Sequence, residues 1–170
     1  MTAVRQHETE LQVVLEYFRL FRHGCPVATR EIHAFLHTYM HSDVRLRGQT
    51  GHDALLQLWR FPNAISHGFC METPAIQAIE LGPTVMVRAG ITARLRISRT
   101  TVTALYPQLL SDEALVQRLV GQEVHLTIVC HLYFDESARV IEIDAQSDNR
   151  MTVGLNQLLG SLDDTYRAVA

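Results

Sequence analysis

The chain has 170 residues, of which 47% are hydrophobic and 19% are charged, an ordinary globular composition that excludes intrinsic disorder. All 15 basic residues are arginines, and they are scattered singly among 18 acidic residues. The sequence therefore has no cluster of positive charge that would bind the phosphate backbone of a nucleic acid. No run approaches the roughly 20 apolar residues of a membrane helix, and no secretory signal is visible at the start of the sequence. We therefore expect an intracellular protein with no direct nucleic-acid contact and no membrane segment.

The cysteines and histidines do not form a metal-binding pattern. The cysteines are odd in number and far apart, and none is in a CxxC pair: Cys25, Cys70 and Cys130. We expect them to be reduced, without a disulfide framework or a structural zinc. Three histidines follow one another at helical spacing, namely His33, His37 and His41. The outer two would be about 12 Å apart along a helix, so a solvated polar stripe is favoured over a metal site. We expect no metal and no cofactor.

The first third of the chain is predicted to be mainly helical. Apolar residues at helical spacing predict a helix over 8–23 and a second over 29–41. Residues 43–47 alternate like a short strand. A third helix is predicted to begin at Thr50 as its cap and to end at Pro62.

The remainder is predicted to be mainly strand. Residues 75–81 form a short apolar stretch, and residues 84–97 and 123–134 alternate cleanly between apolar and polar side chains. A hairpin loop leads from the last of these into a strand over 139–146. Between the two long strands lies an insertion over 98–121 that contains a helix, because acids begin it and a glycine closes it.

No linker divides the chain, so we expect a single domain over 1–170 with its core over about 8–165. The segment from 151 to 169 carries leucines at helical spacing and is predicted to be a helical cover.

This order of elements resembles the nuclear transport factor two-like fold, also called SnoaL-like. Residues 140–144, Asp148 and the segment 157–160 are similar to the final strand and tail of SnoaL-like proteins. The resemblance implies an α+β cone, in which N-terminal helices pack on a curved antiparallel sheet around an apolar pocket. The helical insertion would then precede the last two strands.

A second resemblance concerns a domain that follows the bZIP region in one lineage of transcription factors. The sequence segments that carry this resemblance are Tyr17–Gly24, Tyr106–Glu113, Tyr133–Glu136 and Leu159–Asp164, and the resemblance covers roughly residues 17–167. The basic region and leucine zipper that precede such a domain are missing from these 170 residues. The resemblance implies a separated domain or a standalone paralogue, nuclear in a bZIP factor and otherwise cytoplasmic.

Two carboxylates are candidates for catalysis by resemblance to isomerases and dehydratases of this fold. Asp148 lies where SnoaL-like proteins place an acid in the pocket, and its alternative role is to begin a tail helix. Asp43 lies at a predicted helix-to-strand corner, where it is more often a turn or cap residue.

The strand faces predicted to meet the helices carry no Asp, Glu, His or Tyr. An acid–base enzyme needs a titratable group within reach of its substrate, so catalysis is disfavoured. The interior is instead predicted to be packed core or a pocket for a small apolar ligand. The candidate pocket residues are Tyr17, Phe21, Tyr39, Trp59 and Cys130.

The opposite face of the strands mixes charges with aromatic and hydroxyl groups. It is either solvent surface or an interface, since arginine and tyrosine are enriched in interfaces. The candidate interface residues are Arg88, Arg94, Arg96, His131 and Tyr133. Glu142 and Asp144 on the next strand are predicted to meet these arginines across the sheet.

Two functions remain open. The favoured hypothesis is a non-catalytic domain associated with bZIP-type transcription regulation, which binds an apolar ligand or a protein partner or forms a homo-oligomer. The alternative is a SnoaL-like isomerase, cyclase or dehydratase that uses Asp148 or Asp43.

Overall fold

The computed structural model describes residues 7–146 and Gly160. In this part of the chain seven strands form one sheet in the order β2-β1-β7-β6-β5-β3, with β4 also paired to β5. The strands are β1 (Met40–Leu46), β2 (Gln49–Thr50), β3 (Cys70–Met71), β4 (Ala75–Leu81), β5 (Thr84–Arg96), β6 (Glu123–Phe134) and β7 (Val140–Gln146). All pairs are antiparallel except β1 with β7, which are parallel.

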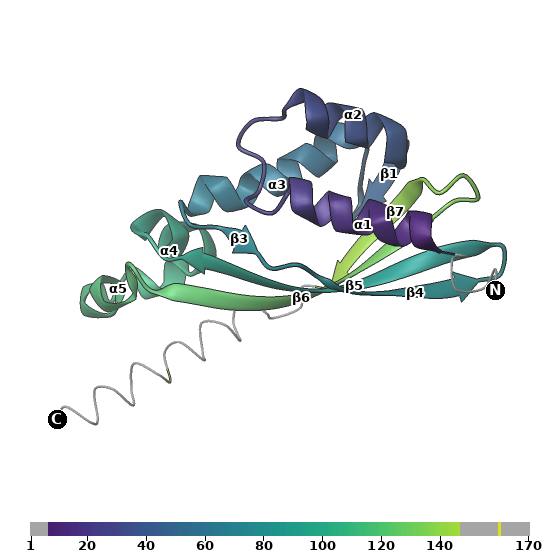
Figure 1. The fold of residues 1–170 in the computed structure, drawn as a ribbon. Helices are drawn as coiled ribbons and strands as arrows, with labels where there is room; N and C mark the ends of the chain where they lie inside the picture. The colour runs from purple at the N-terminus through teal and green to yellow at the C-terminus, as the bar shows by residue number, and fades with distance from the viewer. Residues whose placement is uncertain (1–6, 147–159, 161–170) are drawn as a thin grey trace.

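Three helices cover one face of this sheet (Figure 1). They are α1 (Glu8–Leu20), α2 (Arg30–Tyr39) and α3 (His52–Ile65). The side chain of Thr29 caps α2 by accepting a hydrogen bond from the backbone of Ile32. The other face carries none of these helices, so the sheet has an inner, helix-covered face and an outer face.

The inner face follows from the alternation of apolar residues on the two long strands. Val85, Val87, Ala89, Ile91, Ala93 and Leu95 are all buried on β5. On β6 the buried set is Val124, Leu126, Cys130, Leu132 and Phe134. Because side chains alternate between the two faces of a strand, the polar residues between them lie on the outer face. The predicted alternation is confirmed.

The insertion between β5 and β6 lies at one end of the sheet (Figure 1) and contains α4 (Arg99–Leu105), η2 (Pro107–Leu109) and α5 (Glu113–Leu119). Thr101 anchors it. This side chain is fully buried, takes part in a capping box with Ser98 and donates its hydroxyl to the carbonyl of Ile65 at the end of α3. The predicted α+β fold, with a helical insertion before the last two strands, is confirmed.

Predicted boundaries of all three helices in the first third were wrong. The first helix ends at Leu20 and not at His23, and Phe21 is its C-cap. The second helix ends at Tyr39 and not at His41, because Met40 already pairs with Val140 as the first residue of β1. His41 therefore lies on a strand, and His33, His37 and His41 do not form one helical stripe. The third helix starts after Gly51 and continues through Pro62 to Ile65, whose buried side chain holds its last turn on the core.

The described residues contain no helix that is long and apolar enough to span a membrane. The predicted tail helix over 151–169 and Asp148 lie outside the described residues.

Candidate functional site

The interior between the helices and the sheet holds a cluster of aromatic rings. Tyr17 and Phe21 from α1 and its C-cap are 1% and 0% exposed. Phe21 stacks on Trp59 of α3 at a centroid distance of 5.4 Å and an interplanar angle of 11°. Tyr17 meets Phe21 at 5.2 Å and Trp59 at 5.9 Å, both edge-on. The rings therefore pack on one another, in the offset and edge-to-face geometries that stabilise aromatic pairs.

The phenol of Tyr17 is the polar group at the centre of this cluster. The indole Nε1 of Trp59 donates a hydrogen bond to the Tyr17 oxygen at 2.7 Å. Burial raises the pKa of Tyr17 well above its ordinary value, and this effect outweighs the opposing one of the Trp59 hydrogen bond. The phenol therefore stays neutral at physiological pH and acts as a structural acceptor.

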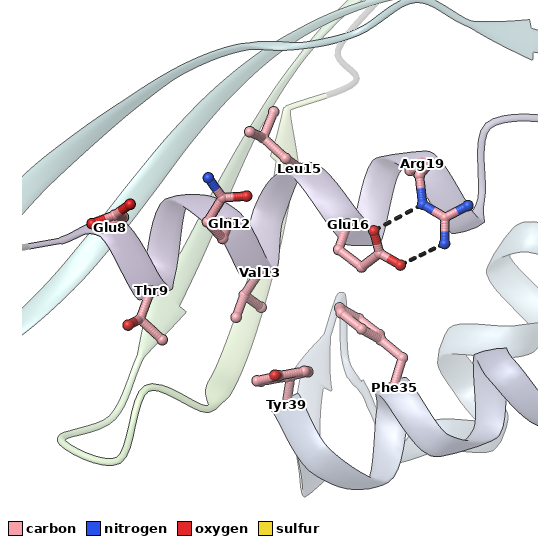
Figure 2. Close-up of a pocket in the computed structure, with 9 residues that line it drawn as sticks. All are labelled: Glu8, Thr9, Gln12, Val13, Leu15, Glu16, Arg19, Phe35 and Tyr39. Atoms are coloured by element: carbon pink, nitrogen blue, oxygen red, sulfur yellow. Dashed lines mark hydrogen bonds and ion pairs between the residues drawn. The ribbon is translucent and has the colours of Figure 1, made fainter.

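The predicted pocket residues divide into two groups. Tyr17, Phe21 and Trp59 are brought together, and Cys130 of β6, which is 7% exposed, lies close enough to Tyr17 to contribute to its raised pKa. Tyr39 is not with them: it is 36% exposed and points into a hollow between α1 and α2 (Figure 2). An apolar ligand could bind among Tyr17, Phe21 and Trp59 only if these packed rings separated. Ligand binding in the interior therefore stays a prediction.

The catalytic candidates of the alternative hypothesis are not brought to the interior by the described residues. Asp43 is exposed on β1, where its backbone amide donates to Nδ1 of His41 at 3.1 Å. Asp148 lies outside the described residues. No group of three or more metal-ligating side chains occurs in the described part of the chain.

The outer face of the sheet carries all five predicted interface residues. Arg88, Arg94 and Arg96 of β5 are exposed, while His131 and Tyr133 of β6 are partly buried. The strand register orders them in rows across the sheet. In one row Gln77 of β4, Arg88, His131 and Asp144 of β7 follow one another, and in the next Met86, Tyr133 and Glu142 do.

The acids of β7 do not meet the arginines of β5, contrary to the prediction. β6 lies between β5 and β7, so Arg88 and Asp144 are separated by two strand spacings, or roughly 10 Å. Glu142 instead pairs with Arg45 of β1 at 3.5 Å, because β1 is its other neighbour. Among the described residues, neither Arg88 nor Asp144 has an ion-pair partner.

A hollow of about 470 Å³ lies beside this face, where the hairpin between β1 and β2 stands against β7. Arg47, with a positive φ of 27°, and Gly48, with a φ of 75°, form the turn of the hairpin. The Arg47 guanidinium donates to the carbonyl of Ala145 at 3.0 Å and fixes the turn on β7. Tyr133 and Glu142 line the same hollow, which makes it continuous with the outer face.

Comparison with known proteins bears on the fold and on the N-terminal part of the chain. The family model described as the BZIP transcription factor 1 C-terminal domain matches residues 11–63, from α1 to α3. TsrD from Streptomyces laurentii is similar in structure with a TM-score of 0.52 at 12% identity, covering 90% of this chain and 96% of that chain. AclR, a proposed hydroxylase from Streptomyces galilaeus, gives 0.52 at 14% identity, with 99% and 96% covered. A proposed polyketide cyclase from Xanthomonas campestris gives 0.50 at 14% identity, with 81% and 89% covered.

No curated protein matches the sequence at a significant level. The fold is nuclear transport factor two-like. The neighbours cover 81–99% of this chain, so the similarity extends over the helices and the sheet together. The resemblance to the nuclear transport factor two-like fold is confirmed. The resemblance to the domain of bZIP factors is confirmed over residues 11–63, which contain the first of its four segments, Tyr17–Gly24. At such low identity the neighbours support the fold of the nuclear transport factor two-like domain and carry no information on its activity.

Sequence reasoning missed two features of the nuclear transport factor two-like domain. Arg45 was not connected with Glu142, because nothing in the sequence indicates that β1 pairs in parallel with β7 some 100 residues later. The hollow between α1 and α2 was also missed. Tyr39 was predicted to line the interior pocket with Tyr17, but it lines this hollow together with Phe35, one helical turn away on α2.

Proposed function

We propose that this chain is a non-catalytic domain associated with bZIP-type transcription regulation and that it forms a homodimer through the outer face of its sheet. The match of residues 11–63 to the C-terminal domain of a bZIP factor supports the regulatory association and, with it, a nuclear location. The observation that carries the dimer is the row of Arg88, His131 and Asp144 on the outer face.

This row is complementary to itself. A twofold axis parallel to the strands and centred on β6 would place Arg88 opposite the partner's Asp144, and Asp144 opposite the partner's Arg88. Both side chains lack an ion-pair partner among the described residues of one copy. A second copy of the chain therefore supplies the charge that each of them needs.

The size of the outer face suits such an interface. β5 and β6 have 13 and 12 residues, about 40 Å of strand each, β4 and β7 have 7 residues each, about 24 Å, and each strand is about 4.8 Å wide. The face is therefore on the order of 600 Å², close to the roughly 800 Å² that each partner buries in a standard interface. Ile79, Met86 and Val129 lie partly buried among its polar residues and would supply apolar contact.

The packed aromatic interior supports the absence of catalysis. An isomerase or dehydratase of this fold would need an acid or base beside its substrate, and the side chains around Tyr17 are apolar or aromatic. Asp43 is exposed on β1.

The test is a charge swap. Light scattering and sedimentation velocity would be measured on the whole chain, on Arg88→Asp, on Asp144→Arg and on the double variant. We expect twice the chain mass for the natural sequence. Two symmetry-related pairs at about 1 kcal/mol each give about 2 kcal/mol, so each single reversal should weaken the dimer roughly 30-fold or more.

The double variant restores both pairs with their signs exchanged and should recover the dimer. Arg60→Asp is the matched control, because it reverses an exposed arginine on α3, on the opposite side of the sheet. A monomer at 100 µM for the natural sequence would refute the dimer. A double variant as weak as the single ones would refute this register.

A further inference from the structure

The hollow between α1 and α2 is a separate feature on the helical side of the molecule. Its volume is about 600 Å³, and it is open to solvent between the two helices (Figure 2). Its lining includes Glu8, Glu16 and Arg19 from α1, and Phe35 and Tyr39 from α2. It takes no part in the proposed dimer, because α1 and α2 cover the inner face of the sheet.

The floor of the hollow is a fixed aromatic surface. Phe35 and Tyr39 lie one turn apart on α2, with ring centroids 5.3 Å apart and tilted by 47°. Phe35 is 6% exposed and stacks on the buried ring of Tyr17 at 6.5 Å. Tyr39, at 36% exposed, therefore stands on a rigid base and presents its ring to the hollow. Such a surface binds apolar side chains, and a cation can lie over the face of the exposed ring.

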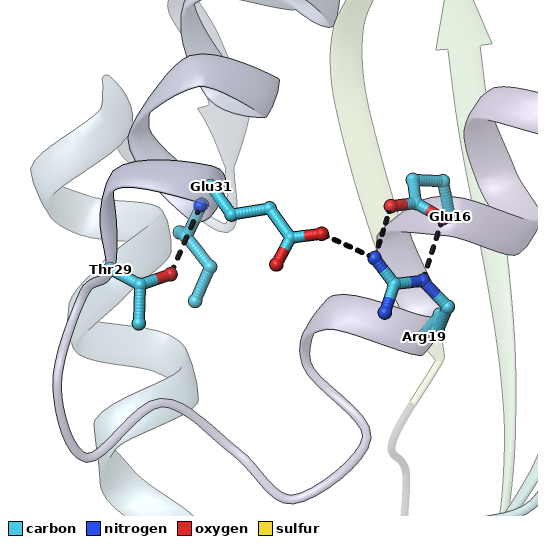
Figure 3. A network of polar contacts seen from close by, with 5 residues as sticks. Glu16, Arg19, Thr29 and Glu31 are labelled. Carbon is cyan, nitrogen blue, oxygen red and sulfur yellow. Dashed lines mark hydrogen bonds and ion pairs between the residues drawn. The ribbon is translucent and has the colours of Figure 1, made fainter.

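The rim of the hollow is acidic. Arg19 is held by two carboxylates, with contacts of 2.8 and 2.6 Å to Glu16 and of 2.6 Å to Glu31 of α2 (Figure 3). The Arg19 hydrogen bond lowers the pKa of Glu16, and both carboxylates raise the pKa of Arg19. Glu16 and Arg19 therefore stay charged. With Glu8 at the other end, three carboxylates and one guanidinium leave two formal negative charges around the hollow.

The acidic positions have a defined spacing. Glu8 and Glu16 are eight residues apart on α1, which is about 12 Å along the helix axis. In Figure 2 the ring of Tyr39 lies between the two levels, and the ring of Phe35 lies below Glu16. A groove of this length between two helices is suited to a third helix of two to three turns.

We propose that the hollow binds an amphipathic helix that places apolar side chains on Phe35 and Tyr39 and an arginine or lysine at each end, toward Glu8 and toward the Glu16–Glu31 pair. Charge complementarity selects a basic partner over an acidic one. A single small cation would satisfy one end and leave most of the 600 Å³ unfilled.

The probe is a pair of fluorescein-labelled synthetic peptides of 18 residues. The basic peptide carries a leucine stripe at helical spacing between arginines eight positions apart, and the acidic peptide has glutamate in place of each arginine. Binding to the whole chain is followed by fluorescence anisotropy at 50 and 300 mM salt. We expect the basic peptide to bind at least tenfold more tightly than the acidic one, with the difference shrinking at the higher salt.

Arg19→Gln and Glu31→Gln form the decisive pair of variants. Both break the same ion pair between α1 and α2 (Figure 3), so mere loosening of the helices would change affinity in the same direction. Recognition of positive charge predicts opposite changes: Arg19→Gln should tighten binding of the basic peptide about threefold, and Glu31→Gln should weaken it about threefold. Glu8→Gln and Tyr39→Ser should weaken it by threefold to tenfold. Glu72→Gln, which removes an exposed carboxylate outside the hollow, should leave it unchanged.

The outcomes are distinct. Equal binding of the two peptides, or a change of the same sign for Arg19→Gln and Glu31→Gln, would overturn the proposal. Displacement of the basic peptide by arginine amide at peptide concentrations would overturn the helical occupant. Circular dichroism of each variant is the control for folding, and a variant that has lost its helical signal is not used.

Discussion

Replacing Tyr17 by Phe tests whether the interior is a closed aromatic core. The substitution keeps the ring contacts with Phe21 and Trp59 and removes only the oxygen that accepts the Trp59 hydrogen bond at 2.7 Å. The indole N–H then has no acceptor in a site that water reaches only in part. Leaving a buried donor unsatisfied costs about 1–3 kcal/mol, and since Trp59 is half-buried we expect about 1–2 kcal/mol at pH 8.

The pH dependence of this loss follows from the raised pKa of Tyr17. Because the folded pKa lies above the unfolded value of about 10, the stability linked to this proton is fully present below pH 10. It is lost as pH rises further, because the unfolded state then ionises and the folded state does not. At pH 11 the unfolded natural protein gains about 1.4 kcal/mol that Tyr17→Phe cannot gain. The difference between the two proteins should therefore shrink to near zero.

The composition makes this titration unusually clean. The sequence contains no lysine, and arginine does not titrate in this range, so only tyrosines and cysteines change charge between pH 9 and 11. Every one of these except Tyr17 is present in both proteins and cancels in the comparison.

The assay is urea unfolding followed by far-ultraviolet circular dichroism at pH 8, 9, 10 and 11, a readout that does not depend on Trp59, the single tryptophan of the chain. A double-mutant cycle with Trp59→Phe should give a coupling energy of about 1 kcal/mol, beyond the roughly 0.3–0.5 kcal/mol expected of independent sites. A gap between natural protein and Tyr17→Phe that stays constant to pH 11 would mean that Tyr17 ionises in the folded state. The interior would then be open to water, and the proposal of a packed core would be refuted.

Two further predictions concern the backbone that holds the helices in place. Thr101→Val should lower the free energy of unfolding by about 1–3 kcal/mol, because the carbonyl of Ile65 loses its donor in the core. Urea unfolding measures this loss, and an unchanged free energy of unfolding would contradict the prediction. Gly24→Ala should cost about 2 kcal/mol or more, because φ is +76° and a Cβ would lie 2.2 Å from Oδ1 of Asn63. Gly48 also has a positive φ, +75°, but nothing lies within 4 Å of the Cβ that Gly48→Ala would add, so this variant should lose only about 1 kcal/mol of stability. Equal losses of stability in the two glycine variants would show that the contact with Asn63 is not the cause.

The strands were predictable because their information is local. The period of two over β5 and β6 alone determines which side chains face the helices, and the buried residues follow it along both strands. The insertion was equally visible, since an Asp-Glu start and a glycine stop surround α5. The outer-face residues were identified correctly for the same reason.

Pairings between distant segments could not be predicted in the same way. Met40 begins β1 because Val140 lies beside it, and no local pattern marks that position as the end of α2. The same parallel pair gives Glu142 its partner Arg45, which leaves the arginines of β5 without the acids that strand parity suggested. Pro62 remains inside α3 because tertiary contacts on both sides outweigh its cost: Leu55 and Leu56 before it and Ile65 after it are buried.

The two proposed surfaces lie on opposite faces of the sheet, and this places a constraint on how they work together. In a dimer with outer faces in contact, α1 and α2 of each copy would face away from the partner, so both hollows would stay open. A basic helix should then bind each copy independently, with two helices per dimer and no cooperativity. Arg88→Asp, which is expected to separate the dimer, should bind the basic peptide with unchanged affinity. If dissociation of the dimer abolished peptide binding, the hollow would depend on the second copy, and the two surfaces could not be the separate sites that the positions of Arg88 and Tyr39 indicate.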